Sequence, residues 1–359
     1  MKNLNLRVIC VYILLILLPI NLVFGQNSIK LGAYYFDGWT GHTYHATDKL
    51  KKNFSEREPV WGWVTSTPNV MESQIDLASD AGISFFNFCW YDTPAANKKG
   101  LEADPKNNAL NLFLKAKNKS KLQYSILVVN NGSYAIDPKE WDDLCSYWLN
   151  LFKDPAYLKV EGKPLITFFD IPSLVKSFGN PQKVKEALNL FRKRANENNL
   201  SGLSIAATFG SKPASIKLAQ DCDFDIITGY NYAAYGLKTT ENEIVPIDSM
   251  STSEERVWDG IKMQWKKPII PAITLNWDRR PWAKTDQRSP RFSGYSGESV
   301  KRSILTCRSW IKKNETSVVP EKIAILYAWN EYGEGAWLTP SRKLKNSLLE
   351  GVKAGLLEK

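Results

Sequence analysis

Histidine and cysteine are scarce in this chain. Its 359 residues include two histidines, His42 and His45, and five widely spaced cysteines. The cysteines are Cys10, Cys89, Cys145, Cys222 and Cys307. This spacing fits neither a dense disulfide framework nor a CxxC metal site, and two histidines nearly exclude a zinc site built on imidazole. A calcium site made of oxygen ligands stays open, but the sequence calls for no metal and no cofactor.

The chain also lacks low-complexity stretches, sequence repeats of about 20–50 residues and any obvious linker. Because 43% of its residues are hydrophobic, it can bury a large core, which excludes intrinsic disorder. Its length suits one large barrel or two modest domains. Without a linker, a single domain over residues 26–359 is the better prediction.

The N-terminal apolar run is too short to span a bilayer. Lys2 and Arg7 precede the mostly apolar residues 11–23, which Pro19 interrupts, whereas a span needs roughly 20 apolar residues. A basic start, a short apolar run and Val-Phe-Gly before Gln26 are typical of a cleaved secretory signal. We therefore expect a signal peptide at 1–25, a secreted or periplasmic protein, and no membrane insertion of the mature chain. The alternative is that this N-terminal run is retained as a membrane anchor.

The formal net charge is +10, but no long basic run accounts for it. Basic residues alternate with acidic ones, which argues against a nucleic-acid partner. A solvated basic surface is the simplest interpretation, and attraction to an anionic glycan is the functional one.

Eight β-rich runs recur along the chain, with helical stretches between them. Several runs are almost continuously apolar, as in ISFFNFCWY, which is typical of parallel strands covered on both faces. The expected strands are Lys30–Tyr35, Ile83–Tyr91, Gln123–Asn130, Pro164–Asp170, Leu203–Phe209, Phe224–Tyr232, Pro268–Trp277 and Lys322–Trp329. The expected helices are Val70–Asp80, Asn107–Lys117, Pro138–Phe152, Gln182–Asn199, Ser253–Gln264, Ser299–Lys312 and Leu344–Leu356.

Alternating strands and helices favour a parallel sheet, and eight strands favour its closure into a (β/α)8 TIM barrel of the α/β class. An open doubly wound sheet is the competitor, but GAYYFDGW follows the first strand in place of a Gly-rich phosphate loop. The long segments 40–69 and 277–297 would then cover the barrel mouth.

Aromatic, amide and acidic side chains gather where these strands end. Carbohydrate sites combine flat apolar platforms with groups that bind hydroxyls, so this composition suits a sugar. The candidate substrate-binding residues are Tyr35, Trp90, Asp92, Asn130, Asp170, Tyr230, Asn231, Trp277, Asp278 and Asn330. For any single aromatic among them, packing inside the barrel is an equally good explanation.

Glu331 and Glu334 follow the eighth strand and are the strongest catalytic candidates. Acids that favour a helix start are the alternative explanation. If the turn is helical, the two carboxyls lie on one face, with Cβ atoms about 5–6 Å apart. Such a pair would struggle to sandwich an anomeric carbon from two sides. One acid could instead protonate a leaving glycosidic oxygen while the other deprotonates an adjacent hydroxyl acting as internal nucleophile.

The stretch YAWNEYGEGAWLTP resembles the WNEW-x-EG-x-x-x-EP signature of glycoside hydrolase family 99 and its WbsX-like relatives. LGAYYFDGW, REPVWGWV, QIDLASDAGISFFNFCWYD, YLKVEGKPLITFFD and NWDRRPW also agree, in the expected order. The resemblance implies a (β/α)8 barrel that cleaves internal α-mannosidic bonds of an oligosaccharide or polysaccharide with retention, through a 1,2-anhydro sugar. It also implies that Glu331 is the base on the 2-hydroxyl and Glu334 the general acid/base.

The motif departs from the family at three positions, which leaves the substrate open. Gly333 replaces a usual His, Tyr332 replaces the second Trp, and Thr339 replaces a usual Glu. The alternatives are a WbsX-like glycosyltransferase using a nucleotide sugar, a glycosidase that pairs one glutamate with Asp170 or Asp278, and a non-catalytic glycan-binding barrel. Nearby, Arg279 and Arg280 could contact an acidic substituent or form salt bridges at the rim. The oligomeric state is not indicated.

Overall fold

The computed structural model describes residues 29–92, 104–209, 214–237, 242–284 and 288–358. The expected signal peptide at 1–25 and Cys10 lie outside these ranges, so the structure does not test them. The other four cysteines are buried free thiols.

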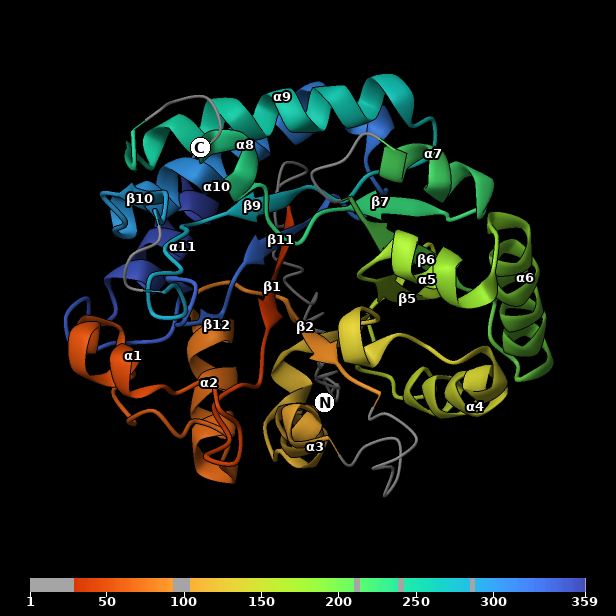
Figure 1. The fold of residues 1–359 in the computed structure, drawn as a ribbon, viewed down its shortest axis with the longest axis horizontal. Helices are drawn as coiled ribbons and strands as arrows, with labels where there is room; N and C mark the ends of the chain where they lie inside the picture. Colours follow the sequence, from red (N-terminus) through yellow and green to blue (C-terminus); the bar gives the residue numbers. More distant parts are fainter. Residues whose placement is uncertain (1–28, 93–103, 210–213, 238–241, 285–287, 359) are drawn as a thin grey trace, which may run out of the picture.

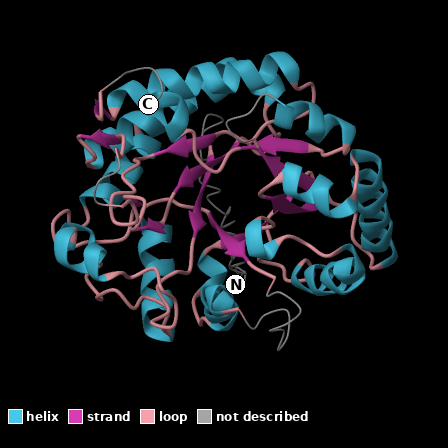
Figure 2. Cartoon of the chain, in the orientation of Figure 1, coloured by secondary structure: helices cyan, strands magenta, loops and turns pink. Residues whose placement is uncertain are grey.

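A barrel of parallel strands forms the centre of the molecule, and helices surround it (Figures 1 and 2). The strands are β1 (Lys30–Tyr35), β2 (Phe85–Trp90), β3 (Gln123–Val128), β5 (Lys163–Phe168), β6 (Ser204–Thr208), β7 (Ile226–Thr228), β9 (Ala272–Thr274) and β11 (Ile323–Tyr327). Their order in the sheet is β7-β6-β5-β3-β2-β1-β11-β9. A single parallel bridge between Ile227 and Ile269 connects the two ends. The predicted TIM barrel is confirmed, with its closure reduced to one bridge.

The helices of the outer ring include every helix expected from periodicity. These are α2 (Pro68–Asp80), α3 (Asn108–Lys115), α4 (Trp141–Leu151), α6 (Pro181–Glu197), α9 (Asp248–Gln264), α10 (Gly297–Lys313) and α11 (Ser347–Leu357). The sequence prediction omitted four shorter helices: α1 (Asp48–Asn53), α5 (Ile171–Phe178), α7 (Ala214–Asp221) and α8 (Ala233–Leu237). In α5 the signals are local: the Asp170 carboxyl accepts a hydrogen bond from the Ser173 amide, and Gly179 ends the helix at a φ of 96°.

Residues of β1 show which side chains face the barrel interior. The Tyr34 hydroxyl donates a hydrogen bond of 2.7 Å to the Gly229 carbonyl beyond β7, so Tyr34 points inward. Tyr35 therefore points outward, where its ring packs against Phe86 and Phe88 of β2 at 5.3 and 5.0 Å. All six residues of β2 are buried, so the strand is covered on both faces, by the barrel interior and by the surrounding helices.

Smaller elements lie at both ends of the barrel. β4 (Lys159–Val160) pairs antiparallel with β5, and β8 (Ile244–Pro246) pairs with β10 (Arg291–Ser293). After β11 the chain forms an antiparallel hairpin of β12 (Asn330–Glu331) and β13 (Ala336–Trp337). Glu331 therefore lies on β12 and Glu334 in the turn of a β-hairpin, so the condition of a helical turn is not met.

Within the ranges that the structure describes, no helix has the length and apolar character needed to cross a membrane.

Candidate active site

A cavity of about 600 Å³ opens at the carboxyl ends of the barrel strands. Its described lining consists of Phe36, Tyr44, His45, Thr47, Cys89, Tyr91, Leu127, Val129, Asn131, Phe169, Tyr230, Pro281, Trp282, Glu331 and Glu334. Only the two glutamates among these residues are acidic. The cavity is thus an aromatic-walled space with one pair of carboxyls, as a sugar-binding site requires.

The hairpin after β11 brings both glutamates into this cavity. The Glu334 amide donates a hydrogen bond of 3.1 Å to the Glu331 carbonyl, which makes the connection a tight turn. The end of β1 holds the hairpin base, because the Phe36 amide donates to the Asn330 side-chain oxygen at 2.8 Å. Trp39 adds a second bond of 2.8 Å from its indole N–H to the Asn330 carbonyl. The acids are therefore mounted on a rigid support.

Glu331 is the deeper acid. Its side chain is 4% exposed, and one carboxylate oxygen, Oε1, accepts a 2.6 Å hydrogen bond from the Tyr230 hydroxyl. Burial raises the pKa of Glu331 well above its ordinary value, and the charge of Glu334 raises it further, while the bond from Tyr230 lowers it. Within the described residues, Oε2 is buried without a hydrogen-bond partner.

Glu334 is half-buried and nearer the cavity opening. The Tyr327 hydroxyl donates a hydrogen bond to its Oε2. Burial raises the pKa of Glu334 to about 7, although the bond from Tyr327 and the charge of Arg279 act in the opposite direction. A carboxyl of this kind can hold a proton near neutral pH and give it to a leaving group.

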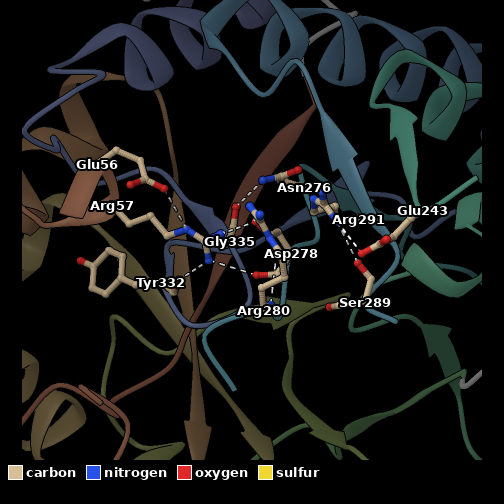
Figure 3. A network of polar contacts seen from close by, with 10 residues as sticks. All are labelled: Glu56, Arg57, Glu243, Asn276, Asp278, Arg280, Ser289, Arg291, Tyr332 and Gly335. Atoms are coloured by element: carbon tan, nitrogen blue, oxygen red, sulfur yellow. Dashed lines mark hydrogen bonds and ion pairs between the residues drawn. The ribbon is translucent and has the colours of Figure 1, made fainter. Parts of the chain in front are cut away.

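A buried arginine ties the hairpin to the loop after β9 (Figure 3). Arg57 is 3% exposed and binds the Asp278 carboxylate at 2.5 Å, the Asp278 carbonyl at 3.0 Å and the Tyr332 carbonyl at 3.0 Å. The Asp278 amide in turn donates to the Glu334 carbonyl at 2.6 Å. Arg280 holds the same carboxylate at 2.8 and 2.7 Å. Arg57 and Asp278 therefore position the turn that carries Glu334.

Three predicted binding residues lie one position away from a cavity-lining residue. Tyr35 faces outward beside Phe36, and Trp90 lies between Cys89 and Tyr91 with its ring stacked on Tyr147 of α4 at 5.6 Å. Asn130 lies between Val129 and Asn131, and its amide exchanges hydrogen bonds of 2.8 and 2.9 Å with the Asp170 backbone. These three side chains were expected to line the mouth. Successive side chains of a strand alternate between its faces, so each of the three points away from the cavity that its neighbours line.

Of four other candidates, three hold the structure together. Asp170 caps α5 through Ser173, Asn330 binds the backbone of β1, and Asp278 is bound by two arginines. Asp92 is buried just past β2, next to residues outside the described ranges. None of the four is among the residues that line the cavity of the glutamates.

The remaining candidates divide between two cavities. Tyr230 lines the glutamate cavity and touches Glu331, as a substrate-side residue would. Asn231 and Trp277 line a neighbouring cavity at the same mouth.

Sequence reasoning missed Trp282 and His45, which line the cavity, and Tyr327, which donates to Glu334. Tyr327 is an inward residue of β11, and only the parity of that strand could have indicated it. His45 packs edge-on against Phe36 at 4.9 Å. Burial lowers the pKa of His45 to about 4, and Lys106 lowers it further against the opposite effect of Asp104. His45 is thus neutral at neutral pH and offers a polar contact without charge.

The described residues contain no group of three or more histidine, cysteine, aspartate or glutamate side chains that could hold a metal ion.

Solved structures with a similar fold include carbohydrate-active barrels. A "Glycoside hydrolase-like protein" has a TM-score of 0.65 and 16% identity, covering 92% of this chain and 95% of its own. The GH99 endo-alpha-mannosidase from Bacteroides thetaiotaomicron has a TM-score of 0.59 and 14% identity, covering 90% and 95%. A GH5_18 protein from Streptomyces cattleya, in complex with Manβ1-4GlcNAc, has a TM-score of 0.52 and 10% identity, covering 92% and 82%. At these identities the likeness concerns the fold.

No curated protein matches the sequence. A family model described as "Glycosyltransferase WbsX" matches residues 58–352, which is most of the chain. This match confirms the resemblance that the acidic motif indicated, and the chain belongs to the WbsX family.

Proposed function

We propose that this protein is a retaining glycoside hydrolase that acts within an α-mannoside-like polysaccharide or oligosaccharide. The observation that carries the proposal is the glutamate pair: two acids from one hairpin turn enter one aromatic cavity, each held by a tyrosine hydroxyl. The fold likeness to glycoside hydrolases supports it. We also propose export through the signal at 1–25, supported by its basic start and short apolar run.

The mechanism uses two carboxyls that serve neighbouring oxygens of the sugar, the 2-oxygen and the glycosidic oxygen. Glu331 takes the proton of the 2-hydroxyl, whose oxygen attacks the anomeric carbon and forms a 1,2-anhydro sugar. Glu334 gives its proton to the departing glycosidic oxygen. Water then attacks the anomeric carbon as Glu334 takes its proton and Glu331 returns a proton to the 2-oxygen. Two inversions at one carbon give net retention.

The surroundings of the two acids bear on these roles. The Tyr230 hydroxyl donates to Glu331 and lowers its pKa, which favours the ionised form that a base needs, whereas burial and the charge of Glu334 raise that pKa. Burial keeps Glu334 protonated near neutral pH, which an acid needs. Asp170 and Asp278 are poorer partners for either glutamate, because one caps a helix and the other is bound by Arg57 and Arg280.

A glycosyltransferase is the second candidate, because the matching family carries that description. It would transfer a sugar from a nucleotide-sugar donor to an acceptor hydroxyl in place of water.

Product analysis separates the two candidates. The mature chain is incubated with α-mannans and acidic polysaccharides, and released oligosaccharides are followed with their anomeric configuration by NMR. We expect internal cleavage and a first-formed product that keeps the α configuration. An inverted product would refute the anhydro-sugar mechanism, and release of nucleotide from GDP-mannose without any glycan hydrolysis would favour the transferase.

A further inference from the structure

A second cavity, of about 700 Å³, lies at the same mouth as the glutamate cavity. Its described lining is Asn231, Ala233, Ala234, Leu237, Trp277, Arg279, Ala283, Arg288, Ser289 and Pro290. Two arginines belong to this lining, and no acidic side chain does. The cavity is therefore electropositive as well as large enough for a sugar ring.

The two cavities share a wall. Tyr230 lines the glutamate cavity, and the next residue, Asn231, lines the second one. The loop after β9 divides in the same way, with Pro281 and Trp282 facing the glutamates while Arg279 and Ala283 face the second cavity. A glycan that extends over this wall from the acids would enter the second cavity.

The neighbouring arginines of this loop differ in what they bind. Arg280 is committed, with three hydrogen bonds to Asp278. Arg279 is exposed, and no salt bridge of 4 Å or less links its guanidinium to an acid in the described part of the chain. A planar guanidinium of this kind is suited to a carboxylate or sulfate, which it can bind through two parallel hydrogen bonds.

The remaining lining suits a sugar ring. Trp277 offers an indole face, and Asn231 and Ser289 offer hydrogen-bonding groups for hydroxyls. The Trp277 ring lies 6.3 Å from the ring of Tyr327, the residue that donates to Glu334. A sugar stacked on Trp277 would thus lie next to the catalytic acid.

From this arrangement we infer that the second cavity is a subsite for an acidic sugar, one that carries a carboxylate or a sulfate group recognised by Arg279 and Arg288. The inference rests on the proposed hydrolase function and adds the chemical class of its substrate. The anion is also matched to catalysis: the charge of Arg279 lowers the pKa of Glu334, and a bound anion would offset that charge and help Glu334 keep its proton.

Binding measured apart from turnover tests the inference. The Glu334→Gln protein is titrated with paired probes: an α-linked galacturonic acid tetramer with its carboxyl-reduced form, and a sulfated mannan oligosaccharide with its desulfated form. The same titrations are made after adding Arg279→Gln, Arg288→Gln or, as a matched control, Lys284→Gln, which removes a nearby exposed charge outside the lining. GDP-mannose serves as the probe for a nucleotide-sugar anion.

We expect the acidic member of at least one pair to bind about tenfold or more tightly than its neutral partner, since charged hydrogen bonds are stronger than neutral ones. The preference should weaken with added salt, disappear in the Arg279→Gln and Arg288→Gln proteins, and persist in the Lys284→Gln protein. Equal binding within both pairs, a preference unchanged in both arginine variants, or tighter binding of GDP-mannose than of either acidic glycan would overturn the inference.

Turnover by the unmodified protein shows whether the subsite proposal or the hydrolase proposal has failed. Hydrolysis of neutral glycans without any acid preference would overturn the subsite alone. An arginine-dependent acid preference without hydrolysis of any glycan would overturn the hydrolase alone.

Discussion

The indole of Trp282 fills the space that a side chain at position 333 would need. A Cβ atom on Gly333 would lie 2.0 Å from Cζ2 of that ring, closer than any real contact allows. Trp282 also lines the glutamate cavity. The glycine that stands where family 99 usually has histidine is therefore matched by a tryptophan from the loop after β9.

This pairing predicts coupled substitutions. Gly333→Ala should destabilise the protein by about 1–3 kcal/mol, because the indole must shift, and adding Trp282→Ala should remove most of that penalty. Denaturant unfolding of the two single variants and the double variant measures the coupling. Gly260→Ala is the control, since a Cβ there meets nothing within 4 Å. Additive effects in the double variant would contradict the pairing.

The catalytic roles predict large losses from small changes. Glu334→Gln and Glu331→Gln should each lower kcat by about 10²–10⁴-fold, the usual contribution of a general acid or base, while glycan binding stays largely intact. Asp170→Asn is the matched control, because asparagine also caps helices and Asp170 is committed to α5. Near-normal turnover by the Glu334→Gln protein, or an equal loss in the Asp170→Asn protein, would refute the assignment.

The acid role also predicts the pH dependence. Because Glu334 must hold a proton and its pKa is about 7, the rate on a neutral glycan should fall as pH rises above about 7. Arg279→Gln removes a charge that lowers this pKa, so the falling limb should move to higher pH. A pH–rate profile of both proteins checks the shift, and a limb that moves to lower pH would contradict the effect of the Arg279 charge on the pKa of Glu334.

Much of this site could be predicted from the sequence, but the facing of individual side chains could not. Motif and strand count together indicated the barrel and the glutamate pair. Facing depends on strand parity, which is read from alternation between apolar and polar residues. In FFNFCW both faces of the strand are buried, so nothing in the letters separates Trp90 from Cys89 and Tyr91. For the same reason the sequence prediction selected Tyr35 and Asn130, each of which lies one position from a residue that lines the cavity.

Long-range partners were also beyond sequence reasoning. Asp278 looked like a substrate ligand because it ends a strand, yet Arg57, far away in the chain, occupies its carboxylate. The spacing of Glu331 and Glu334 is compatible with a helical turn as well as with the hairpin that follows β11. The pairing of Asn330 with Trp337 and of Glu331 with Ala336 defines the hairpin.

The Arg57–Asp278 pair predicts a combined loss of stability and activity. Arg57→Met leaves Asp278 with Arg280 alone and should cost about 3–5 kcal/mol of unfolding free energy. The hairpin turn loses its bond at the Tyr332 carbonyl, so kcat should also fall, by up to about 10²-fold if the acids shift by an ångström. Arg342→Gln removes an exposed pair with Glu58 and should change little. If the Arg57→Met and Arg342→Gln proteins had the same unfolding free energy and the same kcat, the positioning role of Arg57 would be contradicted.

Glu254 of α9 predicts a pH-dependent stability far from the active site. It is 1% exposed, and its carboxyl accepts a hydrogen bond from the Thr274 amide of β9. Burial raises the pKa of Glu254 from 4.5 to about 8, although the bonds from Thr274 act in the opposite direction. Between pH 4.5 and about 8, the Glu254 carboxyl is ionised in the unfolded chain and protonated in the folded chain. Stability is therefore lost as pH rises, by up to about 1.4 kcal/mol per pH unit.

Glu254→Gln keeps an oxygen acceptor for Thr274 and removes the titration. We expect the variant to gain stability relative to the unmodified protein as pH rises from 5 to 8, because glutamine needs no proton to stay neutral. Thermal unfolding at both pH values measures this gain. Glu255→Gln, on the same helix but only half-buried, is the control and should show much less change. A Glu254→Gln advantage that is equal at pH 5 and pH 8 would mean that Glu254 is already ionised in the folded protein, and its burial would then require a cation that neutralises it.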